Sequence, residues 1–303
     1  MPLPFTLTLV ASRAATTLSA ATIAEARELV RGATPALLSP GEAADIPCPA
    51  PSDAFGAPDL SELRARFASR HVDVLLARSR NRRKALLVAD MDSTIVRNET
   101  LDDLAAAADA ARPGTGARVA AITARSMAGE IDFASALRER VALLRGLPDS
   151  AIETAWAHTR LTDGARTLVA TMRAHGATTA LVSGGFTVFA SRVAAACGFD
   201  HVHANTLGVA DGVLTGQVAE PVLGRDSKLA VLRSLAAGRN LRPHATLAVG
   251  DGANDLDMLR DAGLGVAFRA KPVVASAVPN RVDHADLRAL LFAQGYPASA
   301  FSD

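Results

Sequence analysis

Four short, almost continuous apolar segments constrain the fold of this chain more than any other feature. They are ALLVAD (85–90), TTALVS (178–183), ATLAVG (245–250) and LGVAF (264–268). Segments of this kind, with helical patterns between them, predict a parallel β-sheet that is covered by helices on both faces. Ligands of such sheets bind at the carboxyl ends of the strands. The polar residues that end these segments are therefore the first candidates for chemistry.

The first 80 residues follow a different pattern, and we predict that they form a small separate α+β domain. Apolar and polar residues alternate over residues 5–9 and again over 72–76, as expected for half-buried strands. An alanine-rich stretch from about residue 19 to 31 predicts one helix. Asp59 and Glu62 can form a capping box and so predict the start of a second helix, which should end near residue 69. This order of elements resembles that of ACT-like regulatory domains, which bind amino acids.

Residues 81–303 are predicted to form a second domain of the α/β class. Its Rossmann-like parallel-sheet core would consist of residues 81–99 and 163–303. Residues 100–162 show only helical patterns and are predicted to be a helical cap inserted into this core. Asp211 and Gly212 stand between two strand-like segments and predict a β-hairpin.

Composition and charge limit the function classes. The net charge is +1 and the isoelectric point is near 7.9, which argues against nucleic acid as a partner. The basic segment 78–84 is interpreted as a solvated linker. The amino terminus lacks the pattern of a signal peptide, and no apolar segment is long enough to cross a membrane. Cys48 and Cys197 are expected to be reduced thiols, so we expect a cytoplasmic protein; a homodimer is compatible with the sequence.

The segment Asp90-Met91-Asp92-Ser93-Thr94 carries the first chemical signal. Residues two apart on an extended chain project to the same side, so both carboxylates can serve one reacting centre. Asp90 could then attack phosphorus, while Asp92 protonates the leaving oxygen and later deprotonates water. The structural alternative is a turn in which an aspartate caps a helix. The pattern favours chemistry.

Three further signals are weaker when each is taken alone. Ser183 and Gly184 begin a turn that could hold an anion through a hydroxyl and backbone N–H groups, although such turns are common. Lys228, near the start of a helical segment, could neutralise phosphate, but most lysines are simply solvated. The segment Gly250-Asp251-Gly252-Ala253-Asn254-Asp255 could bring more carboxylates to the same sheet edge. Its spacing does not fit an EF-hand, because residues 253 and 262 are both alanine.

The four signals in this order resemble the four motifs of the haloacid dehalogenase superfamily, and the resemblance covers roughly residues 85–303. The resemblance implies a Mg²⁺-dependent hydrolase that forms a phospho-aspartate at Asp90. The Mg²⁺ ligands would be the carboxylates of Asp90 and Asp251 and the main-chain carbonyl of Asp92. Phosphoryl oxygens would be held by Ser183, the Gly184 N–H and Lys228. The remaining two motif residues, Asp255 and Asn254, would support the metal waters and the substrate.

The predicted cap contains an arginine in an unusual place. If residues 133–145 form a helix, Arg140 lies in the middle of the apolar stripe instead of on the polar face. A buried arginine needs an anionic partner, because an unpaired charge there costs several kcal/mol. No acidic residue stands three or four positions away on this helix. The partner must belong to another element or to a ligand, and the pattern alone does not separate these two cases.

The segments VRNETLDDLA and MAGEIDFASALRERVALLRGLP resemble the cap of the phosphoserine phosphatases, a subfamily of this superfamily. The resemblance implies that Glu99 binds the amino group and Arg140 the carboxylate of O-phosphoserine, with Met127 and Phe133 packed over the substrate. One acid and one arginine suit a zwitterionic amino acid. The implied activity is hydrolysis of O-phosphoserine to serine and phosphate, the last step of serine biosynthesis.

Three alternatives stay open at this point. The same phospho-Asp90 could pass its phosphoryl group to another hydroxyl compound, which would make the protein a phosphotransferase. A phosphatase for another small phosphomonoester would leave Glu99 and Arg140 without a purpose. A protein of a different class, an amino-acid sensor with a vestigial phosphatase domain, is disfavoured because all the motif carboxylates and Lys228 are present.

Overall fold

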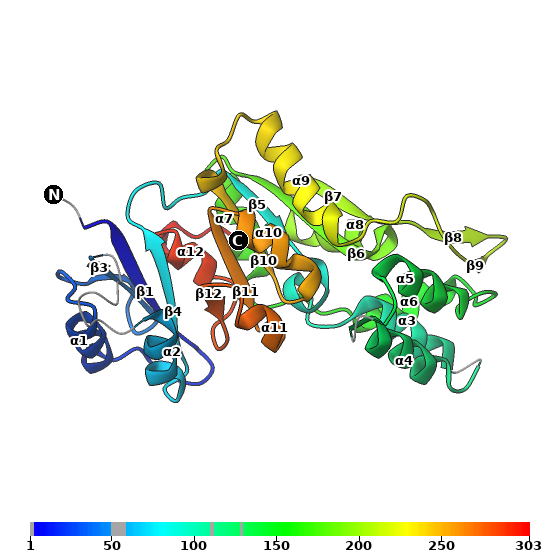
Figure 1. Ribbon diagram of the computed structural model, residues 1–303, viewed down its shortest axis with the longest axis horizontal. Coiled ribbons are helices and arrows are strands. Elements are labelled where there is room, and N and C mark those ends of the chain that lie inside the picture. Colours follow the sequence, from blue (N-terminus) through cyan, green and yellow to red (C-terminus); the bar gives the residue numbers. More distant parts are fainter. Residues whose placement is uncertain (1–2, 50–58, 110–111, 128–129) are drawn as a thin grey trace.

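A computed structural model describes residues 3–49, 59–109, 112–127 and 130–303. The molecule is elongated and has three parts in a row (Figure 1). A four-stranded antiparallel sheet with two helices lies at one end, a six-stranded parallel sheet lies in the middle, and a group of helices with a β-hairpin lies at the other end. The predicted α/β class, with a helical insert and a small amino-terminal antiparallel sheet, is confirmed.

The amino-terminal part contains more strands than the sequence predicted. Its strands β2 and β3 form a hairpin between the two predicted helices, and the order in the sheet is β2-β3-β1-β4. Both predicted helix starts are confirmed, because Ser19 caps the first helix and Asp59 forms a capping box with Glu62. The elements are β1 (Phe5–Ala11), α1 (Ala20–Leu29), β2 (Ala36–Ser39), β3 (Ala43–Cys48), α2 (Leu60–Ala68) and β4 (Val72–Arg78).

The expectation that β1 is half-buried is wrong, since both of its faces are covered. Leu7 and Leu9 pack against α1 and α2, but Thr6 and Thr8 on the other face are buried as well. The hydroxyl of Thr8 donates to Asp45 at 2.7 Å. The second face is covered because the amino-terminal sheet packs against the carboxyl-terminal part of the chain, where β1 and β4 contact α12 (Ala289–Ala293).

The interpretation of residues 78–84 as a solvated linker holds for the exposed Arg78, Arg80 and Arg83 but is wrong for Arg82 and Lys84. The guanidinium of Arg82 lies 2.5 Å from Asp45 and also donates to the main-chain carbonyls of Phe292 and Ala293. The buried Lys84 ammonium donates to the carbonyl of His244 at 2.8 Å. Arg82 therefore fastens the amino-terminal sheet to α12, while Lys84 holds the connecting segment to the central part of the molecule.

All six strands of the central sheet are parallel, and their order is β12-β11-β10-β5-β6-β7. The four apolar segments are confirmed as strands of this sheet. Alternate residues face opposite sides, so that Leu87 and Ala89 belong to one hydrophobic cluster and Leu86 and Val88 to another. The strands are β5 (Leu86–Ala89), β6 (Thr178–Phe186), β7 (His201–Asn205), β10 (Thr246–Gly250), β11 (Leu264–Phe268) and β12 (Asn280–Val282).

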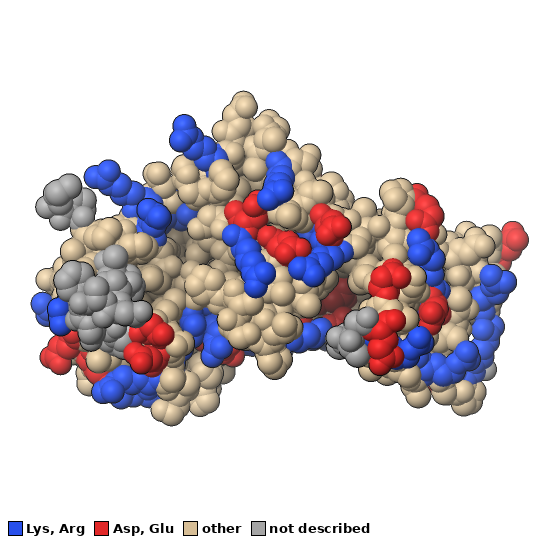
Figure 2. All heavy atoms as spheres, viewed as in Figure 1, with Lys and Arg blue, Asp and Glu red and all other residues tan. Residues whose placement is uncertain are grey.

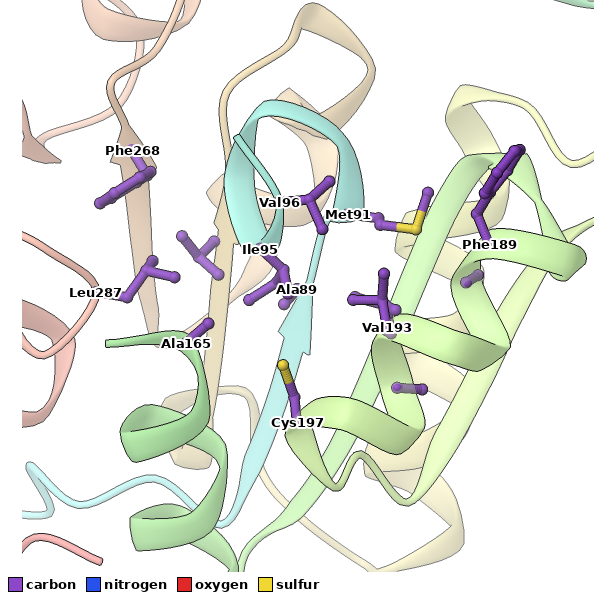
Figure 3. Close-up of a cluster of buried hydrophobic side chains, with 14 of the residues drawn as sticks. Ala89, Met91, Ile95, Val96, Ala165, Phe189, Val193, Cys197, Phe268 and Leu287 are labelled. Atoms are coloured by element: carbon purple, nitrogen blue, oxygen red, sulfur yellow. The ribbon is translucent and has the colours of Figure 1, made fainter. Parts of the chain in front are cut away.

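Helices cover both faces of the central sheet, as predicted. On one face α7 (Ala165–Ala174), α8 (Thr187–Cys197) and α12 contribute to a large apolar core, part of which is drawn in Figure 3. On the other face lie α9 (Arg225–Gly238), α10 (Leu256–Asp261) and α11 (Pro272–Ala275). Cys197 lies in the first core and Cys48 in the amino-terminal core. Both are free thiols, as expected.

In its described residues, the insert contains four helices, α3 (Thr100–Asp109), α4 (Thr115–Met127), α5 (Phe133–Ala142) and α6 (Ser150–His158). The predicted hairpin is confirmed as β8 (Leu207–Ala210) and β9 (Val213–Val218), and it contacts α5 (Figure 1). Asp211 and Gly212 both have positive φ, as a tight hairpin turn requires. The helix expected over 133–145 ends three residues early, because Leu143 closes it and tighter turns follow.

Candidate active site

The central carboxylate, Asp90, directly follows β5, where the strand order places it between β10 and β6. Its N–H donates to the carbonyl of Val249 on β10 at 3.0 Å, which extends the strand pairing up to the site. The chain then forms one π-type turn, η2 (Met91–Ile95), in which Ser93 has a φ of 55°. Met91 is fully buried against the core beneath the sheet edge (Figure 3). Met91, a buried apolar residue between Asp90 and Asp92, thus helps to fix the two aspartates.

The Lys228 side chain connects two buried carboxylates. Its ammonium lies 2.7 Å from Asp90 Oδ1 and 2.6 Å from Asp255 Oδ1. Burial by itself lowers the pKa of Lys228, but the charges of Asp255 and Asp90 outweigh this effect and raise the pKa above its ordinary value. Lys228 is therefore a permanent cation inside the site and is not a solvated surface residue.

Asp90, Asp251 and Asp255 form a cluster in which one carboxylate oxygen from each lies within 4.8 Å of the others. Asp255 fits tightly, because a Cβ on Gly250 would lie 2.3 Å from its carboxyl carbon. Three carboxylates against the single buried ammonium of Lys228 leave an excess of negative charge. An oxygen-lined site of this kind suits a hard divalent cation.

The carboxylate of Asp92 points away from this cluster. Its Oδ1 accepts hydrogen bonds of 2.8 Å from both the N–H and the hydroxyl of Thr100, and its Oδ2 accepts one of 3.1 Å from Ser183 Oγ. Burial, together with the charge of Glu99, raises the pKa of Asp92 to about 6. A carboxyl group with such a pKa can both give and take a proton near neutral pH.

The carboxyl-terminal end of β6 brings the core and the cap into contact. Ser183 Oγ also accepts a hydrogen bond from the Gly185 N–H at 2.8 Å. A Cβ on Gly184 would lie 2.7 Å from the ring of Phe133 on α5. A side chain at position 184 would therefore displace this ring, which gives the glycine there a steric cause.

Arg140 makes no ion pair with any carboxylate among the described residues. Its half-buried guanidinium donates to the carbonyl of Ala136 at 3.3 Å and to the hydroxyl of Thr123 at 3.4 Å. Burial lowers the pKa of Arg140, and the charges of Asp102, Glu99 and Asp92 oppose this effect. The arginine therefore lies in an acidic neighbourhood without a direct partner, as expected if the partner is a ligand.

The remaining predicted residues lie around this centre or are not described. Glu99 is exposed, and its Oε1 accepts a hydrogen bond of 2.7 Å from Ser93 Oγ. Asn254 is half-buried in the loop after β10, where its Oδ1 would lie 2.4 Å from a Cβ on Gly252. The side chain of Met127 lies outside the described part of the structure.

Sequence reasoning missed two contacts in the site. Thr100 is the first residue of α3, and both its N–H and its hydroxyl bind Asp92. Lys271 lies 3.7 Å from Asp251 Oδ2 and approaches the cluster from the start of α11. The sequence offers one signal for Thr100, its position directly after Glu99, and none for Lys271.

Comparison with known proteins places this site in a family. Haloacid dehalogenase-like hydrolases match residues 87–260. A phosphoserine phosphatase of Streptococcus thermophilus is 46% identical over 204 residues, which are 67% of this chain and 93% of that protein. The chain belongs to the phosphoserine phosphatase family of haloacid dehalogenase-like hydrolases. The resemblance that the motifs indicated is thereby confirmed.

Two further members of the phosphoserine phosphatase family extend the comparison. A phosphoserine phosphatase of Streptomyces coelicolor is 42% identical over 240 residues, which are 78% of this chain but only 57% of that protein. A solved structure, a phospho-aspartyl intermediate analogue of phosphoserine phosphatase, is 38% identical with a TM-score of 0.63. It covers 69% of this chain and 98% of its own.

The surface of this family member carries mixed charge. On the face shown in Figure 2, lysine and arginine side chains lie among aspartate and glutamate, and acidic side chains are visible in the hollow beside the cap. In the part of the chain that the structure describes, no helix is both long and apolar enough to span a membrane.

Proposed function

We propose that the protein hydrolyses O-phosphoserine to serine and phosphate through a phospho-aspartate at Asp90. The observation that carries the proposal is Arg140, a half-buried cation without a carboxylate partner among the described residues. It belongs to the cap, which contacts the Gly184 segment through Phe133. A substrate carboxylate would supply the missing partner. Glu99, whose carboxylate is exposed in the same acidic neighbourhood, would bind the amino group.

The proposed reaction has two steps. Asp90 Oδ attacks phosphorus, the bond between phosphorus and the seryl oxygen breaks, and Asp92 gives its proton to that oxygen. Water then attacks the phosphorus of phospho-Asp90 and Asp92 takes a proton from the water. The bond between phosphorus and Asp90 Oδ breaks, which frees phosphate and restores the Asp90 carboxylate. Asp92 is suited to both roles because burial and Glu99 raise its pKa to about 6. Lys228, Ser183 and the Gly184 N–H would hold the phosphoryl oxygens.

The residues present fit a Mg²⁺ ion. The cluster of Asp90, Asp251 and Asp255 offers only oxygen ligands and has more negative charge than Lys228 balances. We assign Asp90, Asp251 and the Asp92 carbonyl as ligands. Asp255 is not assigned as a direct ligand, because its two oxygens already accept hydrogen bonds from Lys228 and the Gly252 N–H; it would support the metal waters. When bound, the ion would screen the phosphate charge from the attacking carboxylate. Burial and the charge of Asp255 raise the pKa of Asp251 to about 6, as expected for crowded carboxylates.

The remaining parts of the proposal concern the whole protein. We divide the chain into residues 1–80 and 81–303, with the cap at 100–162. The separate hydrophobic core around α1 and α2 supports the first boundary, and an amino-acid-binding regulatory role is proposed for that unit. Two buried free thiols support a cytoplasmic location. We also propose that the protein forms a homodimer.

Phosphate release from a panel of phosphomonoesters tests the function. O-phosphoserine, O-phosphothreonine, sugar phosphates and p-nitrophenyl phosphate would be compared with Mg²⁺ and with EDTA. We expect a strong preference for O-phosphoserine, activity that EDTA abolishes and Mg²⁺ restores, and no turnover by Asp90→Asn. Equal activity over the panel would remove the substrate assignment. Phosphorylated homoserine formed in the presence of homoserine would indicate a phosphotransferase.

A further inference from the structure

The Asp92 carboxylate is held by two different parts of the chain. Thr100, which supplies two of the three donors to this carboxylate, is the first residue of α3 and is 1% exposed. Ser183 Oγ, at the end of β6, supplies the third. The cap and the sheet edge therefore meet at one carboxylate that the proposed reaction uses twice.

The contact with Thr100 has a clear physical basis. The first N–H groups of a helix have no partner within the helix, and a carboxylate is a favourable acceptor for them. Asp92 serves this purpose for α3 from eight positions earlier in the sequence. Gly185 leaves room for the contact, because a Cβ there would lie 3.0 Å from Asp92 Oδ2 and 3.4 Å from Thr100 Oγ1.

The two bonds from Thr100 also distinguish the two oxygens of the carboxylate. Oδ1 already accepts an N–H and an O–H, both at 2.8 Å, and so remains an acceptor. Oδ2 has only the weaker bond from Ser183 and lies on the side of the phosphate-binding turn. Oδ2 is therefore the oxygen that carries the proton to the leaving group and later receives one from water.

We propose that Thr100 is a positioning residue that fixes the Asp92 carboxylate for proton transfer and thereby links the cap to both steps of the reaction. The inference rests on the proposed function, since it assigns Thr100 to the proton transfer in that reaction. A displacement of about 1 Å at a reacting group can cost about 100-fold in rate. Loss of the Thr100 hydroxyl should therefore slow both steps while Asp90, Lys228 and the metal cluster stay in place.

The test compares Thr100→Val, which removes the hydroxyl but keeps the shape, with Thr100→Ser, which restores the hydroxyl. Thr154→Val is the matched control, because Thr154 is an exposed cap residue that bonds only to its own helix, at Ser150. Thr100→Ala provides a second variant without the hydroxyl. Circular dichroism and thermal unfolding would establish that each variant is folded.

The readout is the release of nitrophenol from p-nitrophenyl phosphate in the first turnover. Nitrophenolate can leave without a proton, whereas a seryl alkoxide cannot. With p-nitrophenyl phosphate, formation of phospho-Asp90 therefore does not need Asp92, and only the attack of water does. We expect Thr100→Val to show a burst approaching one nitrophenol per active site, followed by slow turnover. With O-phosphoserine its turnover should fall by about 100-fold without accumulation of phospho-enzyme. Thr100→Ser should resemble the wild type.

Other results would overturn the inference. Thr100→Val could behave like the control Thr154→Val, or its turnover of both substrates could fall equally without a burst. Either result would show that the hydroxyl only stabilises α3. The same conclusion would follow if Thr100→Ser failed to restore turnover. Failure of the proposed function would look different, since the wild type itself would then lack turnover or Asp90→Asn would retain it.

Discussion

The ammonium of Lys228 lies 2.7 Å from Asp90 Oδ1, and both side chains are almost completely buried. Burial and the charge of Asp255 raise the pKa of Asp90 well above its ordinary value, although Lys228 opposes this effect. Without a metal ion, Lys228 is the only buried cation in contact with two of the clustered carboxylates in the described structure. The stability of the metal-free protein should therefore depend strongly on this lysine.

We expect Lys228→Met to lower the free energy of unfolding by about 3–5 kcal/mol in EDTA, because it leaves buried carboxylates without a partner. Adding Asp255→Asn to this variant should recover part of the loss, since one of the two orphaned charges is removed. Urea unfolding of the single and double variants measures both effects. Lys271→Met is the control, because its ammonium is half exposed and 3.7 Å from Asp251, so its loss should cost at most about 1 kcal/mol. Equal losses for Lys228→Met and Lys271→Met would contradict the central role of Lys228.

Arg140 should determine specificity and not stability. Removal of a hydrogen bond to a charged group costs about 1.5–3 kcal/mol, which corresponds to roughly 10- to 150-fold in kcat/KM. We expect Arg140→Ala to lose this much with O-phosphoserine. With O-phosphoethanolamine, which keeps the amino group but lacks the carboxylate, the loss should be several-fold at most. Steady-state kinetics with the two substrates measures the difference.

Arg138 provides a matched control on the same helix. It is exposed and pairs with Glu220 at 2.7 Å, away from the catalytic carboxylates. Arg138→Ala should leave the ratio of kcat/KM for the two substrates unchanged. If Arg140→Ala reduced the use of both substrates equally, its role would be structural, and the serine assignment would lose its main support.

The parts of the site that the sequence predicted depend on local patterns. Asp90, Ser183 and Asp251 could be found because each follows an apolar segment whose length and composition define a buried strand. The order of parallel strands then brings their ends together without further information. The fold class and these residues were predictable for the same reason.

The features that the sequence did not predict depend on distant partners. Arg82 appeared solvated because its partners, Asp45 and the carbonyls of Phe292 and Ala293, lie 37 and about 210 positions away. The contact between Thr100 and Asp92 requires the turn at Ser93, which has a positive φ. No local sequence pattern indicates this backbone conformation. A side chain whose role is set by tertiary contacts gives no periodic signal.

Asn280 should be important for the attachment of the amino-terminal sheet. Its side chain accepts the N–H of Leu76 at 2.8 Å and donates to the carbonyl of Leu76 at 3.0 Å, which joins β12 to β4. Asn280→Ala would leave both backbone groups without this partner, at a cost of about 1–3 kcal/mol. We expect a lower urea midpoint and faster hydrogen exchange at Leu76. An unchanged midpoint together with unchanged exchange would show that this pair does not hold the two sheets together.

The buried Lys84 predicts a specific pH dependence of stability. Burial, helped by the charge of Arg82, lowers the pKa of Lys84 from 10.5 to about 8. Between pH 8 and 10.5 the unfolded chain therefore binds more protons at this group than the folded chain does, and the contribution of Lys84 to stability rises with pH. Burial raises the pKa of Cys48 and of Cys197 to about 11, which acts in the opposite direction, so the pH dependence of wild-type stability does not isolate Lys84.

The difference in stability between the wild type and Lys84→Met does isolate the contribution of Lys84, because both proteins contain the cysteines. We expect the free energy of unfolding of the wild type, relative to that of Lys84→Met, to increase across this pH window in urea titrations. A constant difference would show that the ammonium of Lys84 is not destabilised by burial and that its bond to the His244 carbonyl compensates for the loss of water.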